Sequence, residues 1–212
     1  PSPPTTWSST TTCIMGEPLY LYWIHNSEDG SKLTYSHVKV LADGVTVLDR
    51  TIDHTNDDDT TTGSHEFDTS AYPEGTQLLW SVRTAGISKT YSDYSIQRTV
   101  DIYARPTLDV SLTNSQGSVF EDLNSFPFNI SAVPGPASQA PVWYHLEITS
   151  NEVYETVDNV GNVKMVNVGE QVYSKHFDIS TALNVNISAG DVHLENNVSY
   201  TVTCTVSMNS GL

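Results

Sequence analysis

The sequence predicts an all-β chain that folds as two tandem antiparallel β-sandwiches. Short segments in which apolar and polar residues alternate recur along all 212 residues, and a period of two is the pattern of a half-buried strand. No segment places apolar residues at the i, i+3, i+4 and i+7 positions of an amphipathic helix. The second half of the chain also repeats the order of elements in the first half, which indicates two copies of one fold.

The first half contains several strand candidates separated by turns. Four of them are rich in β-branched and aromatic residues, which favour strands: residues 19–24, 35–40, 45–48 and 78–83. Asp43 and Gly44 lie between the second and the third, and an Asp-Gly pair is typical of a two-residue hairpin turn. Residues 97–102 follow as the last strand of this half.

The second half repeats these segments at a near-constant offset. The aligned pairs are 35–40 with 143–148, 66–70 with 176–180, and 78–82 with 200–204. The first two pairs are offset by 108 and 110 residues. The seam falls near Arg105 and Pro106, so the sequence predicts one domain at 1–105 and a second domain at 106–212.

Strand alternation also predicts which side chains form the cores. Because successive strand residues point to opposite faces, Val38 and Val40 are expected in the core. His37 and its counterpart His145 are then expected on the solvated face. Large aromatic residues within strands are expected to anchor the cores: Trp23, Trp80 and Trp143.

The charge balance excludes some classes of partner. The chain has 25 Asp and Glu against 9 Lys and Arg, for a net charge of -16. A chain this acidic has no basic stripe to neutralise phosphate, so we expect it to bind neither nucleic acid nor an anionic membrane surface. No apolar run approaches the roughly 18 to 20 residues of a membrane-spanning helix.

The first half resembles a fibronectin type III domain. Residues 19–23 are similar to the family's second strand with its core Trp, and residues 72–76 resemble its Pro-Gly-Thr turn. Leu78 stands where the family commonly has a corner Tyr, whose hydroxyl bonds to the backbone. In the second half Tyr200 takes that place, and residues 153–173 form a longer middle section. This half is therefore similar to an immunoglobulin-like or divergent fibronectin type III domain.

The whole chain also resembles the tandem fibronectin-like segments of structural proteins in tailed bacteriophages and prophages. The stretches that carry this resemblance are 22–30, 80–86, 97–103 and 149–157. The resemblance implies a non-enzymatic structural or adhesion module of a virion protein of the tail, neck or fibre. Such a module acts as a spacer and contacts other virion subunits or a host-surface glycan. The alternative is an accessory domain pair of a secreted glycan-degrading enzyme or a bacterial surface adhesin, located extracellularly or at the cell surface.

We find no sequence pattern for catalysis or for a cofactor. The seven His residues lack the spacing of metal ligands, and the chain has no Gly-x-Ser-x-Gly nucleophile elbow. We therefore expect no enzyme activity, no catalytic residue and no cofactor-binding residue.

One acidic run is a candidate for calcium. Asp57, Asp58 and Asp59 are consecutive, and calcium takes carboxylate oxygens as ligands. Counted from Asp57, the EF-hand pattern requires Gly and Glu where this chain has Thr62 and Asp68, so that motif fails. A solvated loop is the competing interpretation.

Trp7 is the second candidate for a binding role. It lies in a Ser/Thr-rich opening, residues 5–10, where we expect it to be exposed. An exposed Trp presents a large apolar ring that can stack on a sugar. No row of aromatic residues at a suitable spacing accompanies it in the sequence.

Overall fold

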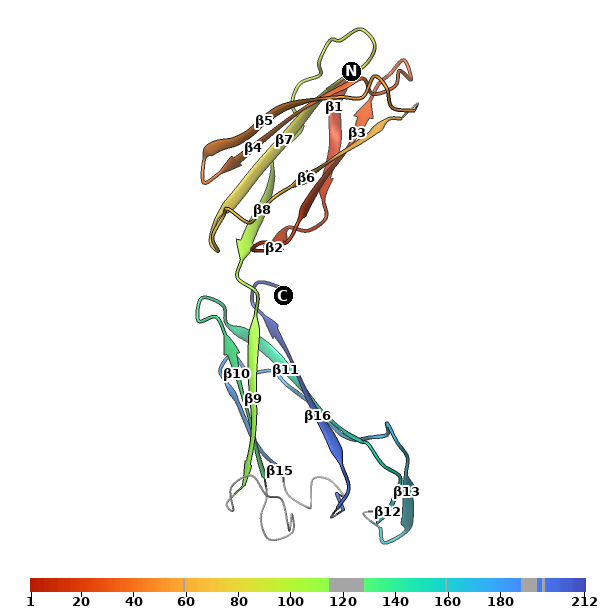
Figure 1. Ribbon diagram of the computed structural model, residues 1–212, viewed down its shortest axis with the longest axis vertical. Coiled ribbons are helices and arrows are strands. Elements are labelled where there is room, and N and C mark those ends of the chain that lie inside the picture. The colour runs from red at the N-terminus through yellow and green to blue at the C-terminus, as the bar shows by residue number, and fades with distance from the viewer. Residues whose placement is uncertain (59, 115–127, 159, 188–193, 196) are drawn as a thin grey trace. The chain divides into compact units, whose positions relative to one another are not determined.

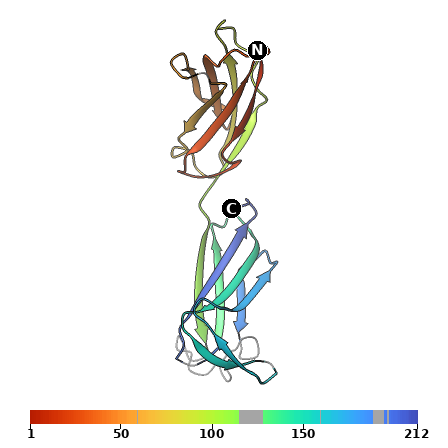
Figure 2. The same ribbon diagram turned by 90° about the vertical axis from the view of Figure 1, so that its right-hand side faces the viewer.

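The computed structural model describes residues 1–212 except 59, 115–127, 159, 188–193 and 196. All regular secondary structure in the described residues is β, as the sequence predicts, and its strands pair almost entirely in antiparallel fashion (Figures 1 and 2). The chain divides into two compact units, Pro1–Arg105 and Pro106–Leu212. We refer to them as unit 1 and unit 2.

Unit 1 is a sandwich of two sheets. Its strands are β1 (Ser2–Ser8), β2 (Thr12–Ile14), β3 (Leu19–Asn26), β4 (Tyr35–Ala42), β5 (Val45–Asp53), β6 (Thr62–Phe67), β7 (Gln77–Ala85) and β8 (Arg98–Tyr103). One sheet has the order β1-β3-β6 and the other has the order β2-β8-β7-β4-β5. All pairs are antiparallel except β2 with β8. This strand order is that of a fibronectin type III-like sandwich.

The β4–β5 hairpin forms at the predicted turn. Asp43 and Gly44 have φ angles of 47° and 83°, and positive φ at both central residues is the requirement of a type I′ turn. Ala42 pairs with Val45 across the turn. Glycine meets this requirement without steric cost, and Asp is among the few other residues that tolerate it.

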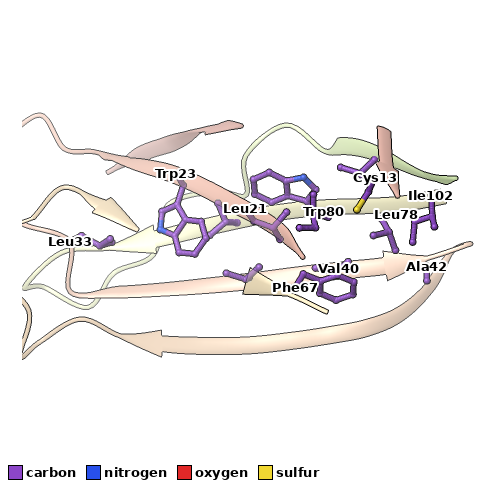
Figure 3. Close-up of a cluster of buried hydrophobic side chains, with 14 residues drawn as sticks. Cys13, Leu21, Trp23, Leu33, Val40, Ala42, Phe67, Leu78, Trp80 and Ile102 are labelled. Carbon is purple, nitrogen blue, oxygen red and sulfur yellow. The ribbon is translucent and has the colours of Figure 1, made fainter. Parts of the chain in front are cut away.

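The core of unit 1 lies between the two sheets. Leu19, Leu21 and Trp23 enter it from β3, and their outward neighbours on this strand are less buried. Val38 and Val40 enter from β4 as predicted. Figure 3 shows how Trp23 and Trp80 lie within this cluster of buried side chains.

Unit 2 is a second sandwich with an added hairpin. Its strands are β9 (Thr107–Asn114), β10 (Phe128–Gly135), β11 (Pro141–Ser150), β12 (Tyr154–Val157), β13 (Val163–Val166), β14 (Gln171–Phe177), β15 (Leu183–Ile187) and β16 (Tyr200–Met208). The sheets have the orders β15-β10-β9 and β14-β11-β16. The hairpin β12–β13 accounts for much of the longer middle section predicted from the sequence (Figure 1).

One of the predicted alignments between the halves is wrong. Residues 66–70 include the end of β6, which pairs with β3 in the first sheet of unit 1. Residues 176–180 include the end of β14, which pairs with β11 in the other sheet. The strand that corresponds to β6 is β15, beside β10. The two segments align in sequence because both contain a Phe-Asp pair, at 67–68 and at 177–178. The sequence of a strand does not specify which neighbouring strand it pairs with.

A second correction concerns Trp143, which is not a core anchor. Trp143 is half-buried and its ring packs against His176, with ring centroids 5.2 Å apart. The next residue, Tyr144, is fully buried, and its hydroxyl donates to the carbonyl of Thr181 at 2.9 Å. From Tyr144 onward, the residues of β11 that share the inward face are the even-numbered ones, including Leu146 and Ile148.

Tyr200 occupies the corner position at the start of β16. Its hydroxyl oxygen accepts a hydrogen bond from the backbone N–H of Glu195 at 2.9 Å. This bond to the backbone a few residues upstream is that of a tyrosine corner. It supports the correspondence between β16 and β7.

Candidate functional site

The outer face of the sheet β1-β3-β6 carries the candidate site. A groove of about 630 Å³ lies over this sheet and the end of β5. We call it the Trp7 groove, and its lining residues are Trp7, Tyr22, Ile52, Asp53, His54, Asp57, Thr62, Gly63 and Ser64. Strand pairing brings three of these residues together, because Trp7 of β1 pairs with Tyr22 of β3, and Tyr22 pairs with Ser64 of β6.

An aromatic row borders the groove. The rings of Trp7 and Tyr22 are stacked, with centroids 5.6 Å apart and an angle of 19° between their planes. Tyr20 continues the row at 6.3 Å and 21° from Tyr22. Trp7 is 44% exposed and Tyr20 is 36% exposed.

The sequence predicts the exposure of Trp7 but misses this row. The three rings come from two strands, so no spacing along the chain reveals them. The signal that was available is the alternation in residues 19–24, which places Tyr20 and Tyr22 on the face opposite to Leu21 and Trp23.

A buried hydrogen-bond chain lies beneath the groove. The indole N–H of Trp23 donates to Ser36 Oγ at 2.8 Å, and Ser36 Oγ lies 3.1 Å from His54 Nε2. His54 Nδ1 lies 2.9 Å from Asp57 Oδ2. All of these groups are satisfied when the imidazole proton is on Nδ1, so that Nδ1–H donates to Asp57 and the Ser36 hydroxyl donates to Nε2.

Gly63 allows the floor of the groove to lie directly on Trp23. A Cβ atom at Gly63 would lie 2.3 Å from Trp23 Nε1. Such a separation is far inside van der Waals contact, so only glycine fits there without displacing the indole.

The Ser36, His54 and Asp57 side chains have the order and distances of a hydrolase triad. A triad serine must reach a substrate carbonyl from an open site. Ser36 is 0% exposed, and its oxygen already accepts the Trp23 indole N–H. These hydrogen bonds therefore connect the core to the loop after β5, and Ser36 is not placed to act as a nucleophile.

The carboxylates of the groove are hydrogen-bond acceptors. Hydrogen bonds from the Thr55 side chain and backbone lower the pKa of Asp53, so this carboxylate remains ionised well below neutral pH. Asp57 is exposed and accepts from His54. Thr62 and Ser64 add hydroxyl groups on the exposed face of β6.

The calcium prediction remains untested by this geometry. Asp57 turns toward His54, Asp58 is exposed, and Asp59 lies outside the described residues. Within the part of the chain that the structure describes, no group of three or more His, Cys, Asp or Glu side chains is placed to hold a metal ion.

A second polar cluster lies on the outer face of β4 and β7. The guanidinium carbon of Arg83 lies 4.8 Å from the ring centroid of Tyr91 and 5.0 Å from that of Tyr94. Arg83 also donates to His37 Nδ1, while His37 Nε2 bonds to Asp49. His37 is on the outer face as predicted, but its side chain is only 18% exposed because these residues cover it.

Comparisons with known proteins show no family assignment. No family model matches the chain, and no curated protein matches it. Among solved structures, the FN1–FN3 domains of chicken CNTN1 are 18% identical with a TM-score of 0.44, covering 99% of this chain and 62% of that chain. A 1.5-MDa bacterial ice-binding adhesin is 13% identical with a TM-score of 0.35, covering 97% of this chain and 64% of that chain. Similarities this weak support no statement about the function of this chain.

Within the described residues, no helix is both long enough and apolar enough to cross a bilayer.

Proposed function

We propose that the chain is a non-enzymatic structural and adhesion module of a larger phage virion protein, in the tail, neck or fibre. The observation that most supports this proposal is the pair of sandwiches, one of which presents an exposed aromatic groove on a sheet face. Exposed apolar surface of this kind marks interaction sites. The resemblance of the sequence to tandem fibronectin-like segments of phage structural proteins supports the virion location.

The partners in this proposal are other virion subunits and a host-surface glycan. The net charge of -16 opposes binding to nucleic acid and to anionic membranes. The spacer role belongs to the scaffold of both units, whereas the contact role belongs to the exposed loops and to the Trp7 groove.

The non-enzymatic part of the proposal rests on chemistry within unit 1. The Ser36 hydroxyl, which has a triad-like relation to His54 and Asp57, is sealed in the core. The groove above it offers carboxylates, hydroxyls and aromatic rings, which suit reversible binding. Turnover of ester, amide or glycosidic substrates by the purified chain would contradict this part.

Mass spectrometry of purified virions and of the culture medium tests the location. We expect peptides of this chain in intact particles, at a stoichiometry that matches a tail, neck or fibre component. Peptides found only in the medium or on the bacterial surface would overturn the virion role. That result would favour an accessory domain pair of a secreted glycan-degrading enzyme or a surface adhesin.

A further inference from the structure

The Trp7 groove combines two surfaces of different chemistry. One side is formed by Trp7 and Tyr22, whose rings are stacked with an angle of 19° between their planes, and Tyr20 continues the row outside the groove lining. Rings stacked at centroid distances of 5.6 and 6.3 Å overlap partly face to face, so Tyr22 is covered by its neighbours and Trp7 is the ring of the groove that is left open to a ligand. A soluble domain that keeps Trp7 44% exposed leaves a large apolar ring available to a ligand.

The other side of the groove is polar and rich in acceptors. Asp53 and Asp57 contribute carboxylates, and Thr62 and Ser64 contribute hydroxyls. Carboxylates form charge-assisted hydrogen bonds with hydroxyl donors, and these bonds are about twice as strong as neutral ones. A ligand that suits the whole groove therefore has an apolar face and several hydroxyl groups.

The negative charge of unit 1 further restricts the class of ligand that the groove can bind. Residues 1–105 contain 14 Asp and Glu against 7 Lys and Arg, and the groove lining contains carboxylates but no Lys or Arg. Sialylated, uronate or phosphorylated ligands would meet repulsion here, and nothing in the lining would pair with their charge.

We propose that the Trp7 groove binds neutral pyranose glycans. The C–H face of a pyranose ring lies on the exposed part of the Trp7 ring, which Tyr22 supports by stacking, and the sugar hydroxyl groups donate to the carboxylates of Asp53 and Asp57. This inference rests on the proposed adhesion function, because it names the ligand class and the residues of that contact.

The test is binding of the full chain to an array of neutral, acidic and amino-bearing glycans, followed by calorimetric titration with the best neutral oligosaccharide. We expect neutral glycans to bind and Trp7→Ala to weaken binding by at least roughly tenfold, as removal of a central aromatic anchor does. Trp7→Phe keeps a ring and is expected to retain most of the affinity. Asp53→Asn removes the charge of an acceptor and is expected to weaken binding by a smaller factor.

Trp143→Ala is the matched control. This Trp also lies on the outer face of a strand, but it is half-buried and belongs to unit 2. We expect glycan binding to be unchanged in this variant, and circular dichroism checks that each variant is folded.

Three results would overturn the inference: no binding to any neutral glycan, binding that Trp7→Ala leaves intact, or a preference for acidic or cationic glycans. None of these results depends on where the protein is found. If the chain is present in virions and the groove binds no glycan, the inference fails while the virion role stands. If Trp7-dependent glycan binding is found and the chain is absent from virions, the virion role fails while the glycan-binding inference stands.

Discussion

The strands β7 and β16 occupy equivalent places in the two units but differ in their neighbours. β7 lies between β4 and β8. β16 pairs with β11 alone among the described residues. The core-facing residues of β7 at 78, 80 and 82 are all 0% exposed. The corresponding residues of β16 at 200, 202 and 204 are only partly buried.

Backbone hydrogen bonds show the same difference. Beyond the end of β8, the N–H groups of Val82 and Thr84 donate to the hydroxyls of Ser95 and Ser92, each at 3.2 Å. In β16, the Met208 N–H donates to the carbonyl of Leu212 at 2.9 Å and therefore points away from β11. Because N–H groups alternate in direction along a strand, the even-numbered amides of β16 share that open side.

The alternation of apolar and polar residues along a strand predicts the face to which each side chain points, but it does not predict how completely that side chain is buried. Both strands place apolar residues on one face at every second position. Among the described strands, β7 has a neighbour on each side and buries these residues completely, whereas β16 has one neighbour and buries them only in part. The fully buried residues of unit 1 form one cluster, whereas those of unit 2 form two smaller groups that are joined through the partly buried Phe177, Val185 and Cys204.

The largest expected effect comes from emptying the core at matched positions. Trp80→Ala in β7 is expected to cost about 3–5 kcal/mol of unfolding free energy, since Trp80 is fully buried. Val202→Ala at the matched position of β16 is expected to cost about 1 kcal/mol, because each lost methylene is worth about 0.8 when fully buried and Val202 is not. Urea unfolding followed by Trp fluorescence and circular dichroism measures both, and equal costs would contradict the comparison.

A smaller effect is expected from matched hydroxyl deletions. Ser36→Ala leaves the indole N–H of Trp23 without its acceptor in the core, at a cost of about 1–3 kcal/mol. Tyr200→Phe removes the corner bond from Glu195, which lies in a more exposed place, at a cost of about 1 kcal/mol. The same urea experiment measures these costs. A Ser36→Ala chain as stable as the parent would show that the hydrogen-bond chain beneath the groove contributes nothing.

The smallest effect is the pH dependence of unit 1. Burial lowers the pKa of His25, helped by the N-terminal amine, and burial also lowers the pKa of His65, helped by Arg50. The folded state therefore favours neutral imidazoles, so their contribution to stability is complete above the unfolded pKa of about 6.5 and is lost as the pH falls below it.

Thermal unfolding of a Trp143→Phe chain measures this effect, because its remaining Trp residues all lie in unit 1. We expect the Tm of the fluorescence transition to fall between about pH 7 and about pH 5. His65→Gln is expected to reduce the slope. A Tm that rises over this range would contradict the assigned direction.

The sequence predicts the strands of the cores well and the contacts between strands poorly. Residues 35–40 and 143–148 lie in β4 and β11, and their alternation correctly orients Val38, Val40, His37 and His145. The prediction for Trp143 is wrong because it rests on the size of the aromatic ring, whereas alternation places Trp143 on the same outward face as His145. The alignment of residues 176–180 is wrong because local composition does not specify which strand a segment pairs with.

The sequence predicts the candidate site only in part, because the site depends on how the strands pair. The sequence indicates Trp7 and the acidic run at Asp57 as two separate candidate features. Their convergence on one groove depends on the pairing of β1 with β3 and on the path of the chain from β5 to β6. Gly63 and the buried Ser36 gave no signal, because their roles depend on the position of the Trp23 indole.

Amide hydrogen exchange of the full chain, measured residue by residue by NMR, tests most directly whether β16 is an edge strand. We expect slow exchange at Val82 and Thr84, whose N–H groups bond to serine hydroxyls. In β16 we expect fast exchange at Val202 and Cys204 and slow exchange at Thr203, whose N–H points toward β11. Equal protection of Val202, Cys204 and Thr203 would contradict the open edge and show that another segment pairs with β16.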